Sequence, residues 1–172
     1  FQDTVVLGNL VLADGTLDLD GNKLEITGDL IQLGGKIILN GGQLHVGKDY
    51  TIGSEDKNAN AYLCMTNKND YVKVNGSFAT YSNCSHFGYL TAGTLEVKGD
   101  FLQKEGDKSN FIAMGTHKVI LSGEGEQTIE FDSPPNHPGM TVLEYSRMNS
   151  LQITRPINER YNFVNETRVW AK

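Results

Sequence analysis

Acidic side chains at alternate positions of short strand-like runs are the first candidates for chemistry. Asp18, Glu25, Glu96 and Glu130 each stand at an outward position in the strand pattern described below. A glycosidase needs two carboxyl groups about 5.5 Å apart, or roughly 6.5–9.5 Å apart. Glu25 and Glu96 occupy equivalent positions three repeats apart, so the spacing of strands predicts a separation of about 14 Å. We therefore expect a solvated acidic face and no enzyme activity.

The histidines and cysteines lack the spacing of a metal site. None of the four histidines belongs to a His-x-x-x-His pair, and neither cysteine has a close partner. The Asp-Gly turns match neither the calcium-binding repeat nor the EF-hand loop, so we expect no metal and no cofactor. Cys64 and Cys84 fall on adjacent repeats at non-equivalent positions. Two unpaired thiols are the favoured interpretation, and a disulfide is the alternative.

Composition and charge narrow the range of partners. The chain has 172 residues and a formal net charge of −6, whereas binding to phosphates needs a concentrated basic surface. We therefore expect no nucleic-acid partner. No apolar run reaches the roughly 18–20 residues that a membrane span requires, so we expect no insertion into a membrane. The chain opens with Phe1 and Gln2 instead of Met, which predicts a segment of a longer protein, monomeric as a fragment.

The carboxylates, histidines and cysteines discussed above belong to a repeated unit of the sequence, which must position them. Residues 8–27 and 28–47 are two copies of one twenty-residue unit, in which Leu10 matches Leu30. Each copy holds short runs of alternating apolar and polar residues, which indicate strands, separated by Gly and Asn, which indicate turns. Such a short unit cannot enclose a core alone and must stack on its neighbours. The sequence therefore predicts an all-β fold: a single-stranded, right-handed parallel β-helix with three strands per coil and about six coils.

The coils can be aligned on their inward and outward residues. Repeats begin near residues 8, 28, 48, 76, 99 and 123. The β-helix is predicted over residues 1–154, and residues 155–172 are predicted to cap its open end or to lead to another domain.

Gln32 and Thr80 would face inward and would then need hydrogen-bond partners. The outward residues of the most regular strand are Glu25, His45, Lys73 and Glu96. Its inward pairs are Leu24/Ile26, Leu44/Val46, Val72/Val74, Leu95/Val97 and Val119/Leu121.

Extra residues in the later coils fall mainly at one corner, between the first and second strands. The second coil closes this corner with Gly34 and Gly35, whereas later coils carry residues 53–60, 82–87 and 104–109. Because coils stack, these insertions should form one ridge, and binding residues usually lie on loops held by a rigid scaffold. Neutral drift of surface loops is the alternative. The predicted recognition ridge consists of Glu55, Asp56, Lys57, Asn60, Asn83, His86, Phe87, Lys104 and Asp107.

Two segments carry a resemblance to known repeats. Thr91–Lys104 (TAGTLEVKGDFLQK) and Gly115–Phe131 (GTHKVILSGEGEQTIEF) resemble β-solenoid segments repeated in very large secreted or surface proteins of Gram-positive bacteria. At the level of the fold, the chain is similar to the filamentous-haemagglutinin-type solenoids of adhesins and polymorphic toxins. The resemblance covers roughly residues 71–151, and the proline-rich loop at 132–139 departs from it. It implies an extracellular or cell-surface location and a structural or adhesive role, and it supplies no catalytic residues.

Three hypotheses of function follow. The first is a non-catalytic segment of a secreted or cell-surface bacterial protein, serving as a stiff stalk or display scaffold with surface glycans or proteins as partners. The second is a carbohydrate-binding or polysaccharide-degrading β-helix. Its sugar-stacking rings would be Tyr71, Tyr81, Phe87 and Tyr89. The third is the delivery stalk of a polymorphic toxin.

Overall fold

The chain forms a parallel β-solenoid built from three sheets. The structure is a computed structural model that describes residues 2–55, 59–132, 145–154, 160–165, 167 and 169. Two of its sheets have seven strands each and the third has three, and all of the strand pairings in the described residues are parallel. This confirms the all-β parallel β-helix, with three strands per coil, that the repeat predicts.

Sheets A and B each take one strand from each successive coil, and sheet C takes one strand from each of three successive coils. Sheet A contains β1 (Thr4–Val6), β4 (Lys23–Ile26), β7 (Gln43–Val46), β10 (Tyr71–Val74), β12 (Thr94–Val97), β14 (Lys118–Leu121) and β16 (Ser150–Ile153). Sheet B contains β2 (Leu10–Leu12), β5 (Leu30–Gln32), β8 (Tyr50–Ile52), β11 (Phe78–Thr80), β13 (Phe101–Gln103), β15 (Gln127–Phe131) and β17 (Tyr161–Val164). Sheet C contains β3 (Thr16–Asp18), β6 (Gly35–Ile38) and β9 (Ala61–Cys64).

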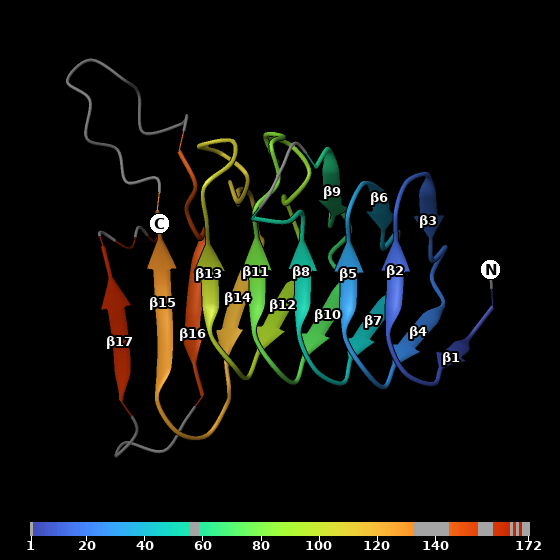
Figure 1. Cartoon of the computed structure of the whole chain (residues 1–172), viewed down its shortest axis with the longest axis horizontal. Helices are drawn as coiled ribbons and strands as arrows, with labels where there is room; N and C mark the ends of the chain where they lie inside the picture. The colour runs from blue at the N-terminus through green and yellow to red at the C-terminus, as the bar shows by residue number, and fades with distance from the viewer. Residues whose placement is uncertain are drawn as a thin grey trace.

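The path of the chain is visible in Figure 1. The strands of sheet B point upward in front, those of sheet A point downward behind them, and β3, β6 and β9 lie near the top. The coils advance from the N-terminus at the right towards the left, which makes the winding right-handed, the usual hand for parallel crossovers. Beyond β9, single bridges continue the third side of the coil, pairing Met65 with Leu90 and Leu90 with Ala113.

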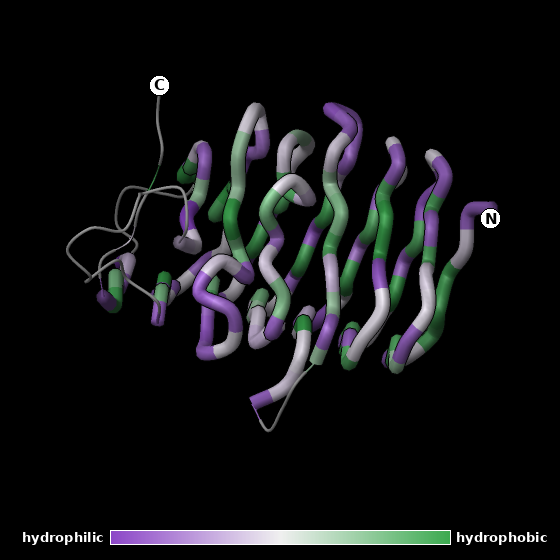
Figure 2. Tube along the Cα trace, turned by 90° about the horizontal axis from the view of Figure 1, so that it is seen from above, coloured by the Kyte–Doolittle hydropathy of each residue, from purple (hydrophilic) through white to green (hydrophobic). Residues whose placement is uncertain are grey.

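The inward ladders lie in the predicted register. Leu24, Leu44, Val72, Leu95 and Val119 pair in succession across sheet A, and each is at most 2% exposed. Burying one such side chain contributes about 1.5–3 kcal/mol. Figure 2 shows hydrophobic and hydrophilic residues alternating along the coils. This period of two directs one set of side chains to the core and the other to solvent.

Aromatic rings continue the ladder that Leu10 and Leu30 begin in sheet B. Tyr50, Phe78 and Phe101 follow Leu30 in register, and neighbouring ring centroids are 5.5 Å apart. Phe111, which follows the insertion 104–109, packs with its ring centroid 4.8 Å from that of Phe101. This sheet B ladder therefore changes from aliphatic to aromatic along the solenoid axis, whereas the ladder of sheet A stays aliphatic.

Polar residues inside the solenoid are satisfied locally. Gln32 is fully buried, accepts a 2.7 Å hydrogen bond from the Tyr50 hydroxyl, and donates to the Tyr62 carbonyl at 3.1 Å. Gln103 is also buried and donates to Asn110 Oδ1 at 2.9 Å. The two amides do not stack on each other, because the coils between them carry Ile52 and Thr80 at the same position. Each amide therefore finds a different partner, as buried polar groups require.

A ladder of short polar side chains runs along the corner that precedes sheet B. In each step, a side-chain oxygen accepts a hydrogen bond from a backbone N–H of the next coil. The steps run from Asn9 to Asp29, Asp49, Ser77, Asp100 and Thr128, at 2.7–3.2 Å. A Cβ at Gly28 would lie 2.1 Å from Asn9 Oδ1, and one at Gly76 would lie 2.2 Å from Asp49 Oδ1. These glycines are required because the ladder occupies the space of a side chain.

The C-terminal part of the chain adds a further strand to the solenoid. β17 pairs in parallel with β15, with Phe163 opposite Ile129. Sheet B therefore extends past residue 154, where the sequence predicts the end of the β-helix. Phe163 is 47% exposed on this last strand. Residues 155–159, Trp170 and most of the proline-rich loop lie outside the described residues.

Candidate functional site

The insertions of consecutive coils lie against one another at the corner where the strands of sheet B end, at the top of Figure 1. The Asn83 N–H donates to the Ala59 carbonyl at 3.1 Å, and the Asp107 N–H donates to the Ser82 carbonyl at 2.9 Å. The loops are therefore hydrogen-bonded coil on coil, as the strands are, and they form one continuous surface along the solenoid.

Buried polar side chains anchor these loops to the strands. Ser82 is fully buried and donates from its hydroxyl to the Ala61 carbonyl at 2.8 Å. Asn110, also fully buried, donates to the Ser82 carbonyl at 3.1 Å and accepts from Gln103. Because each of these groups would be costly to leave unpaired, the network holds neighbouring loops in one arrangement.

The predicted recognition residues that the structure describes differ in their exposure. Glu55, Asn60, Asn83 and Phe87 are exposed, and Lys104 and Asp107 are half-buried. His86 is only 1% exposed, and its Nε2 accepts a 3.2 Å hydrogen bond from the Leu63 N–H. The loop folds this imidazole back over β9, so its side chain does not reach the surface as predicted. Asp56 and Lys57 lie outside the described residues.

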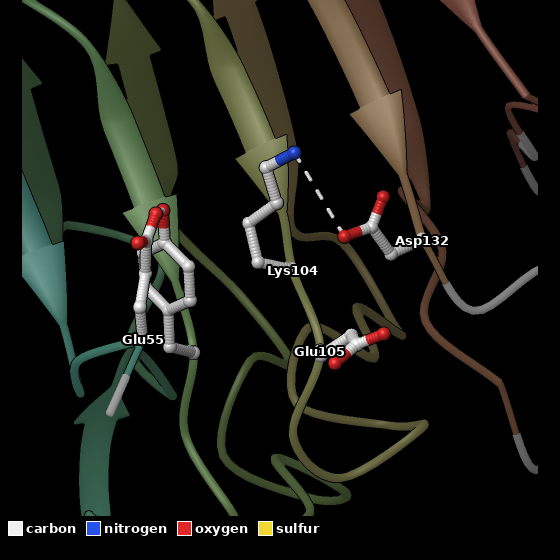
Figure 3. Close-up of a pocket in the computed structure, with 5 residues that line it drawn as sticks. Glu55, Lys104, Glu105 and Asp132 are labelled. Atoms are coloured by element: carbon white, nitrogen blue, oxygen red, sulfur yellow. Dashed lines mark hydrogen bonds and ion pairs between the residues drawn. The ribbon is translucent and has the colours of Figure 1, made fainter. Parts of the chain in front are cut away.

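Two of the predicted residues, Glu55 and Lys104, line a hollow of about 300 Å³ together with Tyr81, Glu105 and Asp132. We call this hollow the corner groove (Figure 3). Tyr81, Lys104 and Asp132 directly follow β11, β13 and β15, and each donates its N–H to the preceding coil at 2.7–2.9 Å. The sequence predicts Tyr81 only as a sugar-stacking ring, and neither Glu105, although it lies in the insertion 104–109, nor Asp132 is among the predicted recognition residues. Tyr81 and Asp132 directly follow strands of sheet B, and Glu105 lies one residue further from its strand. This shared position in the repeat is the sequence signal that could have identified them.

Lys104 forms ion pairs with two acidic residues beside the corner groove. Its Nζ lies 2.5 Å from Glu130 Oε2 and 3.8 Å from Asp132 Oδ2, the second of which is dashed in Figure 3. Burial by itself lowers the pKa of Lys104, but the hydrogen bond to Glu130 and the charge of Asp132 outweigh it and leave that pKa raised. The Lys104 hydrogen bond lowers the pKa of Glu130. Burial, followed by the neighbouring Glu130, raises the pKa of Asp132.

The corner groove is suited to recognition by charge and hydrogen bonds. Two neighbouring carboxyl groups with pKa values shifted in opposite directions resemble an acid–base pair, yet both contact the same ammonium group of Lys104. At the other side, the Tyr81 hydroxyl donates to Glu55 Oε1 at 3.1 Å. We assign no catalytic step to the groove, because Lys104 is engaged by Glu130 and Asp132, and Glu55 is engaged by Tyr81.

The four candidate carboxylates lie on three different sides of the coil. Glu25 and Glu96 are on sheet A, Asp18 is on sheet C, and Glu130 is on sheet B. Glu25 forms a 2.8 Å ion pair with Lys23, and Asp18 accepts a hydrogen bond from the N–H of residue 20 at 2.9 Å. They do not converge on one space where a substrate could sit between them.

The metal-ligating residue types are also dispersed. The described residues contain no group of three or more His, Cys, Asp or Glu side chains that could hold a metal ion. Cys64 and Cys84 are both free thiols, which confirms the favoured interpretation, and burial raises the pKa of Cys64 to about 11. His137 lies outside the described residues.

The candidate sugar-stacking rings do not form one platform. Tyr71 lies on sheet A, Tyr81 lines the corner groove, and Phe87 and Tyr89 follow in the loop beside sheet C. Tyr89 instead pairs with Tyr62, with ring centroids 5.1 Å apart. Lys36 Nζ lies 5.3 Å from the centroid of each of these two rings. Tyr62 is thus an aromatic residue of this surface that the insertion pattern does not predict.

Together, the fold and the corner groove define the chain as a parallel β-solenoid whose loops gather along one corner. Comparison with protein-family models, curated proteins and solved structures finds no match. The described residues contain no helix long and apolar enough to cross a membrane.

Proposed function

We propose that the chain is a non-catalytic β-solenoid segment of a secreted or cell-surface bacterial protein, serving as a stiff stalk or display scaffold. The observation that carries this proposal is the continuity of the inward ladders. Sheets A and B each join seven strands in parallel, so backbone hydrogen bonds and buried side chains link every coil to the next. Bending such a rod would break several bonds at once, which favours a mechanical role.

The corner loops supply what the scaffold would display. The second coil closes this corner through Gly35, whereas later coils place charged, amide and aromatic side chains there. Loops on a rigid frame are common sites of binding. Surface glycans or proteins are the partners that we propose, with the chain acting as a monomer.

The extracellular or cell-surface location rests on the resemblance of Thr91–Lys104 and Gly115–Phe131 to surface repeats of Gram-positive bacteria. A delivery stalk of a polymorphic toxin would share the same mechanical role and differ only in its cargo. The location and the cargo are both part of the proposal.

The test of the display scaffold is to replace residues 53–60 with Gly-Gly, copying Gly34 and Gly35 of the second coil. Because the second coil closes the same corner this way, we expect unchanged β-sheet circular dichroism and a melting temperature within a few degrees. Beads coated with the variant should attach less well to glycan- or cell-coated surfaces than beads coated with the original chain. Unfolding of the variant would contradict the idea of a scaffold that is independent of its loops.

A carbohydrate-binding solenoid is the second candidate. It is favoured by the pairing of Tyr62 with Tyr89 under Lys36, and by the neighbouring Phe87, which is 57% exposed. Aromatic rings offer large rigid surfaces with little conformational freedom to lose on binding. Binding of glycans that is lost in Tyr89→Ala, and retained in Tyr71→Phe on sheet A, would favour this candidate.

A further inference from the structure

The outward face of sheet A contains a hollow that neither proposed function uses. It has a volume of about 500 Å³ and surrounds Gly47, and its lining includes Glu25, His45, Lys73, Asn75 and Lys98. We call it the sheet A hollow. Pockets of roughly 300–1,000 Å³ accommodate small molecules, so this space suits a ligand of about the size of one sugar.

The hollow is built into the backbone. Thr27, Gly47, Asn75 and Lys98 occupy equivalent outward positions on consecutive coils, and the last three donate their N–H groups to the preceding coil at 2.7–3.0 Å. A Cβ at Gly47 would lie 2.3 Å from the Thr27 carbonyl oxygen. The close approach of the two coils therefore excludes a side chain at Gly47 and leaves space between Thr27 and Asn75.

The two carboxylates of this face are already engaged. Glu25 Oε2 forms a 2.8 Å ion pair with Lys23. Glu96 accepts hydrogen bonds from the Tyr71 hydroxyl and, at 2.7 Å, from the Ser122 hydroxyl. Burial raises the pKa of Glu96, but these two hydrogen bonds, followed by the charges of Lys73 and Lys98, outweigh it and leave that pKa lowered.

Among the described residues, the lysine and asparagine side chains that line the hollow form fewer close ion pairs and hydrogen bonds than the two carboxylates do. Lys73 Nζ approaches Glu96 only to 3.9 Å, and no ion pair joins Lys98 to any residue that the structure describes. The side-chain amide of Asn75 likewise forms no hydrogen bond to a described residue. Burial lowers the pKa of His45, the charges of Lys23 and Lys73 lower it further, and those of Glu25 and Glu96 raise it. Two lysines, Lys73 and Lys98, therefore line this hollow in a chain whose net charge is −6.

We propose that the sheet A hollow binds an oxyanion carried on a sugar-sized molecule, namely a sugar carboxylate or sugar sulfate. Lys73 and Lys98 would donate charge-assisted hydrogen bonds to the oxyanion, which are stronger than those between neutral groups. The Asn75 amide would donate to a neighbouring oxygen of the same ligand. This inference does not depend on the stalk role, because the lining comes from the strands of sheet A and not from the corner loops.

The experiment is an NMR titration of the ¹⁵N-labelled chain with four probes: glucuronate, glucose 6-sulfate, inorganic sulfate and glucose. We expect saturable shifts of the Gly47, Asn75 and Lys98 amides with the two acidic sugars and none with glucose. The amides of Tyr81 and Asp132 in the corner groove should stay in place. Inorganic sulfate should bind more weakly than glucose 6-sulfate. Equal affinity for the two would overturn the assignment of a sugar-sized ligand.

Matched variants test the donors. Lys98→Ala and Lys73→Ala should each weaken the affinity for glucuronate by roughly tenfold, the effect expected of losing a hydrogen bond from a charged group. Lys118→Ala removes a lysine of the same sheet that does not line the hollow, and should leave the affinity unchanged. An absence of saturable shifts in the original chain, or equal weakening by all three variants, would overturn the proposal. The spectra themselves report whether each variant is folded.

Discussion

At the scale of single residues, two buried histidines stand out. His117 is fully buried, and neither of its ring nitrogens has a hydrogen-bond partner among the described residues. The centroid of its ring lies 6.0 Å from that of Phe111. Burial lowers the pKa of His117 to about 4 and that of His86 to about 4. A neutral imidazole tolerates these surroundings, whereas a charged one would lose its hydration without compensation.

These pKa values predict lower stability in mild acid. The unfolded chain binds each proton near pH 6.5, whereas the folded chain binds it only near pH 4. Between these values the unfolded state holds more protons, so the free energy of unfolding falls as the pH falls. From pH 7 to pH 5 we expect a loss on the order of 2 kcal/mol per histidine, measured by urea denaturation.

The matched variant is His117→Leu, which places an apolar group beside Phe111. It should flatten the pH dependence between pH 7 and pH 5, whereas His45→Gln on the half-buried outer face should change it less. A pH dependence that is the same in His117→Leu as in the original chain would contradict the assignment of this loss to His117.

At the scale of elements, the corner ladder explains the recurring Gly-Asx and Gly-Ser pairs. The turn before sheet B leaves a backbone N–H without a strand partner, and the polar side chain of the preceding coil accepts its hydrogen bond. The same side chain fills the space beside the glycine of the next coil. A local turn signal is therefore also a contact between coils.

We predict that Asp49→Ala lowers the free energy of unfolding by about 1 kcal/mol, because the Ser77 N–H loses its acceptor at 2.7 Å. Asp49→Asn keeps a side-chain oxygen and should lower it less. The control is Asp14→Ala in an exposed turn, where the carboxylate accepts a hydrogen bond from the N–H of the adjacent Gly15. It should change stability by less than about 0.5 kcal/mol. Equal effects of Asp49→Ala and Asp14→Ala in urea denaturation would show that the ladder adds little.

At the scale of the whole molecule, charged groups are distributed over different sides of the solenoid. The acidic side chains of the corner groove lie at the ends of sheet B strands, and the sheet A hollow lies on another side of the coil. This separation favours a body with distinct recognition surfaces over one enclosed catalytic centre.

We predict that incubation with acidic and neutral polysaccharides, including pectin and alginate, releases no cleavage products. The physical reason is that Glu130 is paired with Lys104 at 2.5 Å and that Asp18 lies on a different sheet. Chromatography of reducing and unsaturated ends is the measurement. Reproducible product release that is lost in Glu130→Gln or Asp18→Asn would instead favour a polysaccharide-degrading β-helix.

The sequence by itself determined the solenoid and its register. Alternation with period two, repeated every twenty residues, decides which face of each strand is buried, because a slip by one residue would expose every apolar side chain. The inward position of Leu24 and the outward position of Glu25 follow from this rule alone, and the structure confirms both.

Only the tertiary structure decided which loop residues reach the surface and which side chains lie together in the corner groove and the sheet A hollow. Insertions have no period, so nothing local reveals that His86 folds back to the Leu63 N–H. The corner groove joins residues as distant as Glu55 and Asp132, and the sheet A hollow arises because two backbones approach closely at Gly47. These features depend on contacts between coils, whose positions are set by the stacking of the whole chain.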